Sequence, residues 1–118
     1  MSTVLIVDDE VRILAALRRS LRREGWQILT ADGPAEALQI LAREPVDLVL
    51  SDHKMPGMSG SDLLREVASR WPNVIRLLIT GWSEAVSDEE LREIGIRDMI
   101  PKPWDDAELK SILRRHLA

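Results

Sequence analysis

Four apolar residues stand directly before two carboxylates at residues 4–9, in the stretch VLIVDD. Residues 46–52, VDLVLSD, repeat the arrangement, with a mainly apolar run that leads into Asp52. Short apolar runs of this kind are typical of strands buried on both faces of a parallel sheet. The two stretches therefore predict two inner strands that carry acidic residues toward their carboxyl ends.

Amphipathic segments separate these runs from similar ones. After Val11, for example, Leu14, Leu17 and Leu21 recur at helical intervals. The predicted strands cover residues 4–7, 26–30, 46–50, 74–79 and 96–100. Helices are predicted from Val11 to near Gly25, after residues 32–34, before Pro72, from about Glu84 to Ile94 and after residues 102–104. This alternation predicts an α/β fold: a three-layer, doubly wound sheet of five parallel strands with five helices, in one domain of residues 1–118.

Composition narrows the classes of function. The chain has no cysteine, which excludes disulfides, thiolate metal sites and a cysteine nucleophile. Its net charge of −4 argues against direct nucleic-acid binding. No apolar run is long enough to span a membrane, and the first residues lack the basic segment of a secretory signal. We therefore expect a cytoplasmic protein that binds neither membrane nor nucleic acid.

Polar residues follow four of the five predicted strands. Asp8 and Asp9 follow the first, Asp52 the third, Thr80 the fourth and Lys102 the fifth. Ligands of doubly wound sheets bind beyond the carboxyl ends of the strands, where the strand order reverses. In the flavodoxin-like order 2-1-3-4-5, which belongs to the fold class and is not deduced from these residues, that reversal lies between strands 1 and 3. We therefore expect these five side chains to meet at one edge of the sheet.

Three clustered carboxylates need positive charge. Two unit charges about 4 Å apart repel by roughly 4 kcal/mol at an effective dielectric near 20. Lys102 supplies one positive charge, so a divalent cation is needed for neutrality. Ligands that are all oxygen favour Mg²⁺ over zinc or copper. Such a site suits an Asp52 nucleophile that attacks phosphorus, with Lys102 and the Thr80 hydroxyl binding the phosphate oxygens.

The chain resembles the receiver domains of two-component response regulators over nearly its full length. The segments that carry the resemblance are VDDE at 7–10, SDHKMPGMSG at 51–60, ITG at 79–81 and PKPW at 101–104. Each segment alone is a weak or moderate signal, but their order and spacing together are specific. The resemblance implies a flavodoxin-like sheet with the strand order 2-1-3-4-5.

The resemblance also implies roles for six residues. Asp52 would accept the phosphoryl group, Thr80 would be the switch hydroxyl and Lys102 the phosphate-binding lysine. The metal, Mg²⁺ or alternatively Mn²⁺, would be bound directly by Asp9 and Asp52, through water by Asp8, and by the backbone carbonyl of Lys54. The peptide between Lys102 and Pro103 would be cis.

Partners follow from the same resemblance. A histidine kinase or a phosphotransfer protein would supply the phosphoryl group, and a fused or separate output domain would receive the signal. Phosphorylation would repack the surface of helix 4, strand 5 and helix 5, where a homodimer is also conceivable. The domain would catalyse only its own phosphorylation and dephosphorylation, and would not be an enzyme acting on other substrates. Met99 stands where receivers usually carry Tyr or Phe, so the usual aromatic switch is in question.

Two other functions stay open at the level of the sequence. An aspartyl-phosphate hydrolase would need Asp-x-Asp after the first strand, but Glu10 occupies the position of the second Asp. A phosphorylation-independent interaction module would look similar but would not need all the site residues.

Two further features have alternative interpretations. Near the end of the first helix lies a cluster of four arginines, Arg18, Arg19, Arg22 and Arg23. These arginines either form a solvated face whose charge interacts favourably with the helix dipole, or contact a kinase or phosphotransfer protein. Trp82 and Lys54 each lie two residues after a site residue. We hypothesise that Trp82 shields the acyl phosphate from water.

Overall fold

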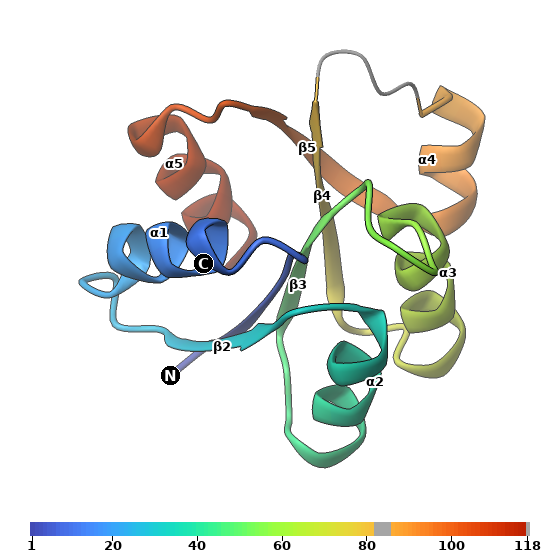
Figure 1. Cartoon of the computed structure of the whole chain (residues 1–118), viewed down its shortest axis with the longest axis horizontal. Coiled ribbons are helices and arrows are strands. Elements are labelled where there is room, and N and C mark those ends of the chain that lie inside the picture. The colour runs from blue at the N-terminus through green and yellow to red at the C-terminus, as the bar shows by residue number, and fades with distance from the viewer. Residues whose placement is uncertain (82–85, 118) are drawn as a thin grey trace.

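The computed structural model describes residues 1–81 and 86–117, which form one sheet with helices on both faces (Figure 1). The elements are β1 (Thr3–Val7), α1 (Val11–Leu21), β2 (Gln27–Ala31), α2 (Pro34–Arg43), β3 (Leu48–Asp52), α3 (Gly60–Arg70), β4 (Ile75–Gly81), α4 (Asp88–Ile94), β5 (Ile96–Lys102) and α5 (Asp106–Leu117). All strand pairs are parallel, in the order β2-β1-β3-β4-β5. The predicted fold class and strand order are confirmed.

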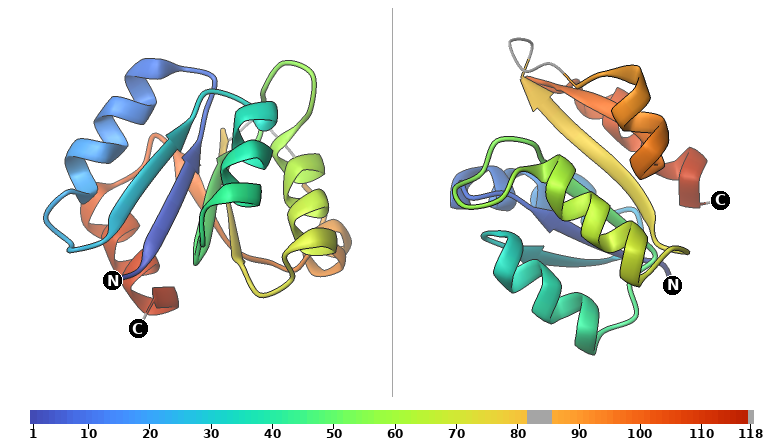
Figure 2. Two further views of the ribbon diagram at one scale, coloured as in Figure 1. Left: turned by 90° about the horizontal axis from the view of Figure 1, so that it is seen from below. Right: turned by 90° about the vertical axis from the view of Figure 1, so that its right-hand side faces the viewer.

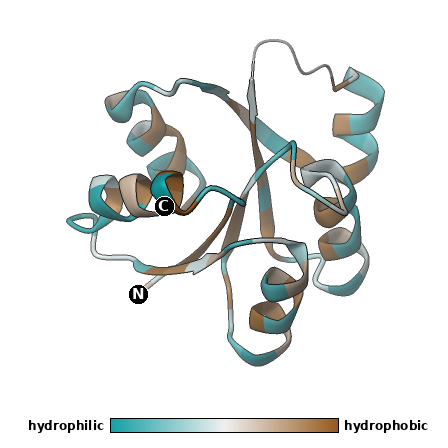
Figure 3. Cartoon of the chain, in the orientation of Figure 1, coloured by the Kyte–Doolittle hydropathy of each residue, from teal (hydrophilic) through white to brown (hydrophobic). Residues whose placement is uncertain are grey.

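The inner strands separate two hydrophobic cores. Every residue of β1 and β3 is buried. On β1, Val4 and Ile6 face a core shared with α1 and α5, whereas Leu5 and Val7 face a core shared with α2, α3 and α4. Figure 2 shows these helices on opposite faces of the sheet, and Figure 3 shows hydrophobic residues on the strands and on the helix surfaces that face them. The apolar runs therefore reflect burial on both faces, as predicted.

β3 and β5 extend further toward the candidate site than the sequence predicts. Asp52 is the last residue of β3 and Lys102 the last of β5, although both were predicted to follow their strands. Asp52 pairs with Ile79, and the next backbone N–H, that of His53, donates to Ile79 O at 3.0 Å. Lys102 pairs with Gly81. Backbone hydrogen bonding thus extends through polar residues that end the apolar pattern, and it fixes their positions.

The start of α4 also differs from the prediction. The helix begins at Asp88, not near Glu84, because the Ser87 side chain caps it by accepting the backbone N–H of Glu90 at 3.1 Å. Glu84 itself and Trp82 lie outside the described residues, so the role hypothesised for Trp82 stays a prediction. Within the described parts of the chain, no helix has the length and apolar character needed to cross a membrane.

Gly60 lets the first turn of α3 approach the end of β3 very closely. A Cβ at this position would overlap the backbone oxygen of Asp52 and would lie 2.8 Å from the Cα of His53. The Gly60 N–H donates to His53 O at 2.6 Å, and Ser59 caps the helix by accepting the Asp62 N–H at 3.1 Å. The loop between β3 and α3 is therefore held against the backbone of Asp52.

Replacing this glycine tests the close approach. We expect Gly60→Ala to lower the free energy of unfolding by about 2–3 kcal/mol, because the added methyl group meets backbone atoms that cannot rotate away. Urea unfolding followed by circular dichroism measures the loss. The control is Gly33→Ser, since a Cβ at Gly33 meets nothing within 4 Å and serine is a good N-cap for α2. Equal stability of Gly60→Ala and the wild type would contradict the proposed packing.

Candidate functional site

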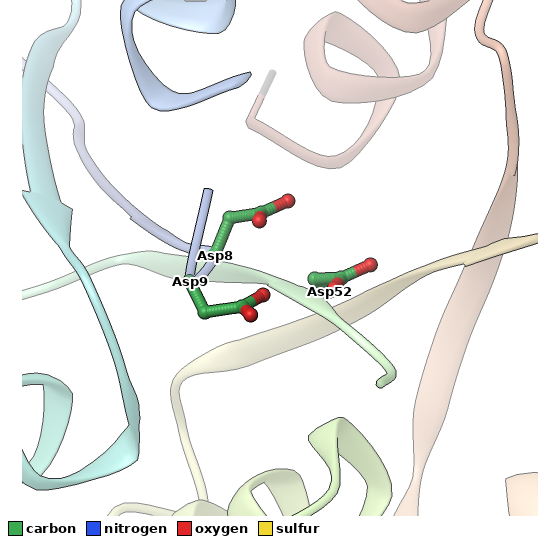
Figure 4. Close-up of side chains that lie close together, drawn as sticks. All are labelled: Asp8, Asp9 and Asp52. Carbon is green, nitrogen blue, oxygen red and sulfur yellow. The ribbon is translucent and has the colours of Figure 1, made fainter. Parts of the chain in front are cut away.

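Four strands bring the predicted site residues to the carboxyl edge of the sheet. Asp8 and Asp9 follow β1, Asp52 ends β3, Thr80 lies in β4 and Lys102 ends β5. One carboxylate oxygen from each of Asp8, Asp9 and Asp52 lies within 4.8 Å of the others, and Figure 4 shows the three side chains grouped together. Asp8 and Asp52 are buried, whereas Asp9 is exposed. The predicted convergence of these carboxylates is therefore observed.

Lys102 reaches across the edge to two of these carboxylates. Its Nζ lies 2.9 Å from Asp52 Oδ1 and 3.5 Å from Asp8 Oδ2. Partial burial alone would lower the pKa of Lys102. The hydrogen bond to Asp52 and the negative charges of Asp52 and Asp8 outweigh this effect, so the pKa is raised. Lys102 is therefore positively charged at neutral pH and stands beside the carboxylate of Asp52.

The hydrogen bonds of the described residues satisfy only one of the two carboxylate oxygens of Asp8. Its Oδ1 accepts the backbone N–H of Glu10 at 2.8 Å. Its Oδ2 is buried and accepts no hydrogen bond from the described residues, with the Lys102 ammonium 3.5 Å away. Burial raises the pKa of Asp8 from 3.8 to about 6; the Glu10 hydrogen bond and Lys102 oppose this rise, whereas Asp52 and Asp9 add to it.

These features fit a hard divalent cation. Three carboxylates supply oxygen ligands from two adjacent strands, and a buried oxygen of Asp8 lacks a hydrogen-bond donor among the residues described. One lysine leaves the cluster with excess negative charge. Carboxylate oxygens are the ligands that Mg²⁺ binds in proteins, usually together with waters and phosphate oxygens. Asp8, Asp9 and Asp52 are therefore the residues that can hold such an ion.

The other predicted residues surround this cluster. Thr80 is buried and lies one position beyond Ile79, the residue of β4 that pairs with Asp52. Lys54 lies two residues after β3, and its side chain is exposed. The predicted cis peptide between Lys102 and Pro103 is present. At the start of α1, the N-cap residue is Glu10 and not Asp9, and no side chain of the described residues caps the helix by a hydrogen bond.

Sequence reasoning missed three contributions to this edge. Asp8, besides its predicted role, orders the turn into α1 by accepting the Glu10 N–H. Gly60 holds the loop between β3 and α3 against Asp52. In addition, Ser61 Oγ lies 3.1 Å from Nδ1 of His53. A glycine as the first residue of a helix is a weak signal that could have identified Gly60, since glycine is a poor helix former. The sequence carries no comparable signal for the Ser61–His53 contact.

Comparison with known proteins places the chain in a family. A family model for the response regulator receiver domain matches residues 4–114. Sporulation initiation phosphotransferase F of Bacillus subtilis is 32% identical over 114 residues, which cover 97% of this chain and 92% of that protein. The crystal structure of the signal receiver domain of an HD domain-containing protein from Pseudomonas fluorescens Pf-5 has a TM-score of 0.93 at 34% identity and covers 98% of this chain and 94% of that chain.

Several relatives are much longer than this chain. The hydrogenase transcriptional regulatory protein HoxA of Cupriavidus necator is 42% identical over 104 residues, which cover 87% of this chain but 21% of HoxA. The chain thus spans about a fifth of the length of that relative. The matches to the family model, to a relative of similar length and to solved receiver structures agree with one another. The chain therefore belongs to the response-regulator receiver domains of two-component signalling systems.

Proposed function

We propose that residues 1–118 form one receiver domain that takes a phosphoryl group onto Asp52. The observation that carries this proposal is the position of the Asp52 carboxylate, 2.9 Å from Lys102 Nζ and grouped with Asp8 and Asp9. A phosphohistidine on a histidine kinase or phosphotransfer protein is the donor. One Asp52 oxygen forms a bond to phosphorus while the phosphorus–nitrogen bond breaks, and the imidazole nitrogen keeps the electron pair and takes up a proton. The product is an acyl phosphate.

Two side chains of this domain stabilise the transferred group. The Lys102 ammonium, already beside Asp52, pairs with the phosphoryl oxygens as charge builds on them. The Thr80 hydroxyl, buried on the neighbouring strand, donates a hydrogen bond to the same group. Both groups are held by strands of the sheet, so little reorganisation is needed when the phosphoryl group arrives.

Asp8, Asp9, Asp52 and the backbone carbonyl of Lys54 hold Mg²⁺, or alternatively Mn²⁺, in this proposal. The ion when bound offsets negative charge on the phosphoryl oxygens. The domain's own contribution is a preformed set of carboxylates, one of them a buried Asp8 with a raised pKa. Deprotonation of Asp8 and ion binding are therefore coupled.

Signalling follows from a change of surface. Phosphorylation shifts an equilibrium that repacks α4, β5 and α5, and this surface controls an output domain or forms a homodimer. Met99 lies in β5 and is 37% exposed, so it is accessible on that surface. The domain acts on no substrate other than its own Asp52 and the phosphorylated donor.

The first test is direct phosphorylation. Wild-type protein incubated with Mg²⁺ and acetyl phosphate should gain one phosphoryl mass by intact mass spectrometry, and hydroxylamine should remove it because acyl phosphates are labile. Asp52→Asn should remain unmodified, because the amide is not a nucleophile. The matched control is Asp62→Asn, an exposed aspartate on α3, which should be phosphorylated like the wild type. A wild type that stays unmodified, or a modified Asp52→Asn, would exclude Asp52 as the acceptor.

The second test concerns the cost of holding a buried charge on Asp8. The pKa of Asp8 is higher in the folded protein than its usual value of 3.8, so the folded state binds this proton more tightly. Without metal, Asp8 therefore lowers the stability increasingly as pH rises from about 4 to about 6, and fully above that range. Asp8→Asn keeps an oxygen that can accept the Glu10 N–H but removes the charge. It should stabilise the metal-free protein by about 1–3 kcal/mol at neutral pH.

Urea unfolding in the presence of a chelator measures this gain at neutral pH and near pH 4. The advantage of Asp8→Asn should shrink at the lower pH, where Asp8 of the wild type is protonated. It should also shrink when Mg²⁺ is added, since the wild type then gains the free energy of ion binding. An advantage that does not change with pH would mean that the Asp8 charge is not the cause.

A further inference from the structure

A second charged feature lies away from the Asp52 site, between α1 and the edge strand β2. A groove of about 320 Å³ is lined by Arg18, Arg19, Arg22, Trp26 and Ile28. None of these residues belongs to the carboxylate cluster. Figure 1 shows α1 beside β2, which is the outermost strand on one side of the sheet. The sequence revealed the arginine cluster but not its association with Trp26.

The three arginines of this groove lack anionic partners. Across residues 1–81 and 86–117, no carboxylate forms an ion pair with Arg18, Arg19 or Arg22. Glu24, which follows α1 closely, is already bound by both Nε and Nη2 of Arg114, at 2.5 and 2.7 Å. Concentrated positive charge is therefore left on this groove although the chain as a whole carries a net charge of −4.

The remaining walls of the groove are apolar. Ile28 is 8% exposed, and Trp26 is partly buried and packs against the core shared with α1 and α5. Arg18 is held over the strand by a hydrogen bond from its Nη2 to Thr30 Oγ1 at 3.2 Å. Guanidinium groups bind phosphate oxygens in pairs, and indole rings stack on flat heterocycles. A ligand that matches both walls is a phosphorylated compound with a flat aromatic ring.

We propose that this groove binds a mononucleotide, with the phosphate on the arginines and the base against Trp26. The volume lies at the lower end of the range for small-molecule sites, which are about 300–1,000 Å³. No glycine-rich loop is involved, so recognition is by side chains alone. The positive charges of the arginines also interact favourably with the helix dipole of α1, and this interaction is compatible with ligand binding.

The experiment is a titration of metal-free Asp52→Asn protein with AMP. The substitution ensures that phosphorylation of Asp52 does not contribute to the measured signal. Calorimetry and the indole N–H signal of Trp26 in NMR spectra should show saturable binding with Kd below about 1 mM. Arg19→Gln and Arg22→Gln should each weaken binding about tenfold, because each removes a charge-assisted hydrogen bond. The matched control is Arg23→Gln, an exposed arginine of the same cluster that does not line the groove, and it should change Kd less than about twofold.

Titrations with inorganic phosphate and ribose 5-phosphate distinguish the contribution of the arginines to binding from that of Trp26. Both should bind more weakly than AMP, and Trp26→Leu should weaken AMP much more than inorganic phosphate. The exposed arginine variants keep the proposal testable if Trp26→Leu fails to fold. The proposal is overturned if AMP does not saturate the protein below about 10 mM. It is also overturned if inorganic phosphate binds as tightly as AMP, or if Arg23→Gln weakens binding as much as Arg19→Gln.

Discussion

Mutual repulsion among Asp8, Asp9 and Asp52 is the constraint on which the rest of this site depends. The three carboxylates offer oxygens within 4.8 Å of one another, and two of the side chains are buried. At such distances each pair of charges costs several kcal/mol at an effective dielectric near 20, as an order of magnitude. Lys102 offsets part of this cost through Asp52 and Asp8. Burial, with smaller contributions from the charges of Asp52 and Asp9, raises the pKa of Asp8 to about 6. In the proposed mechanism, a bound dication would relieve the repulsion, and the ion and Lys102 would balance the negative charge of the phosphoryl group.

The fold imposes this unfavourable arrangement. β1 and β3 are adjacent parallel strands buried on both faces, so their carboxyl ends cannot separate without exposing both cores. The turn after β1 is fixed by the Asp8–Glu10 hydrogen bond, and the loop after β3 is held by Gly60. Hydrophobic packing of the whole domain thus stabilises a local cluster that would otherwise disperse. Because the folded domain already holds the carboxylates together, the free energy of ligand binding is not spent on assembling the site.

Much of this arrangement could be predicted because burial leaves a clear pattern. The run Val4–Val7 and the polar residues after each inner strand predicted both the sheet and the meeting of Asp8, Asp9 and Asp52. The ends of β3 and β5 could not be predicted, since backbone pairing continues through polar residues such as Asp52 and Lys102. Tertiary contacts, such as those of Gly60 with Asp52 or of Trp26 with the arginines of α1, produce no periodic pattern in the sequence. They emerge only when separate elements are packed.

We propose that the carboxylate cluster and Lys102 form a single site that a dication and a phosphoryl group complete. A crystal structure of the protein with Mg²⁺ and beryllofluoride, a mimic of the phosphoryl group, tests it most directly. We expect beryllium bonded to a carboxylate oxygen of Asp52, with fluorines facing Lys102 and Thr80. We expect the metal among Asp8, Asp9 and Asp52. Beryllofluoride bound elsewhere, or a metal that avoids these carboxylates at saturating concentration, would contradict it.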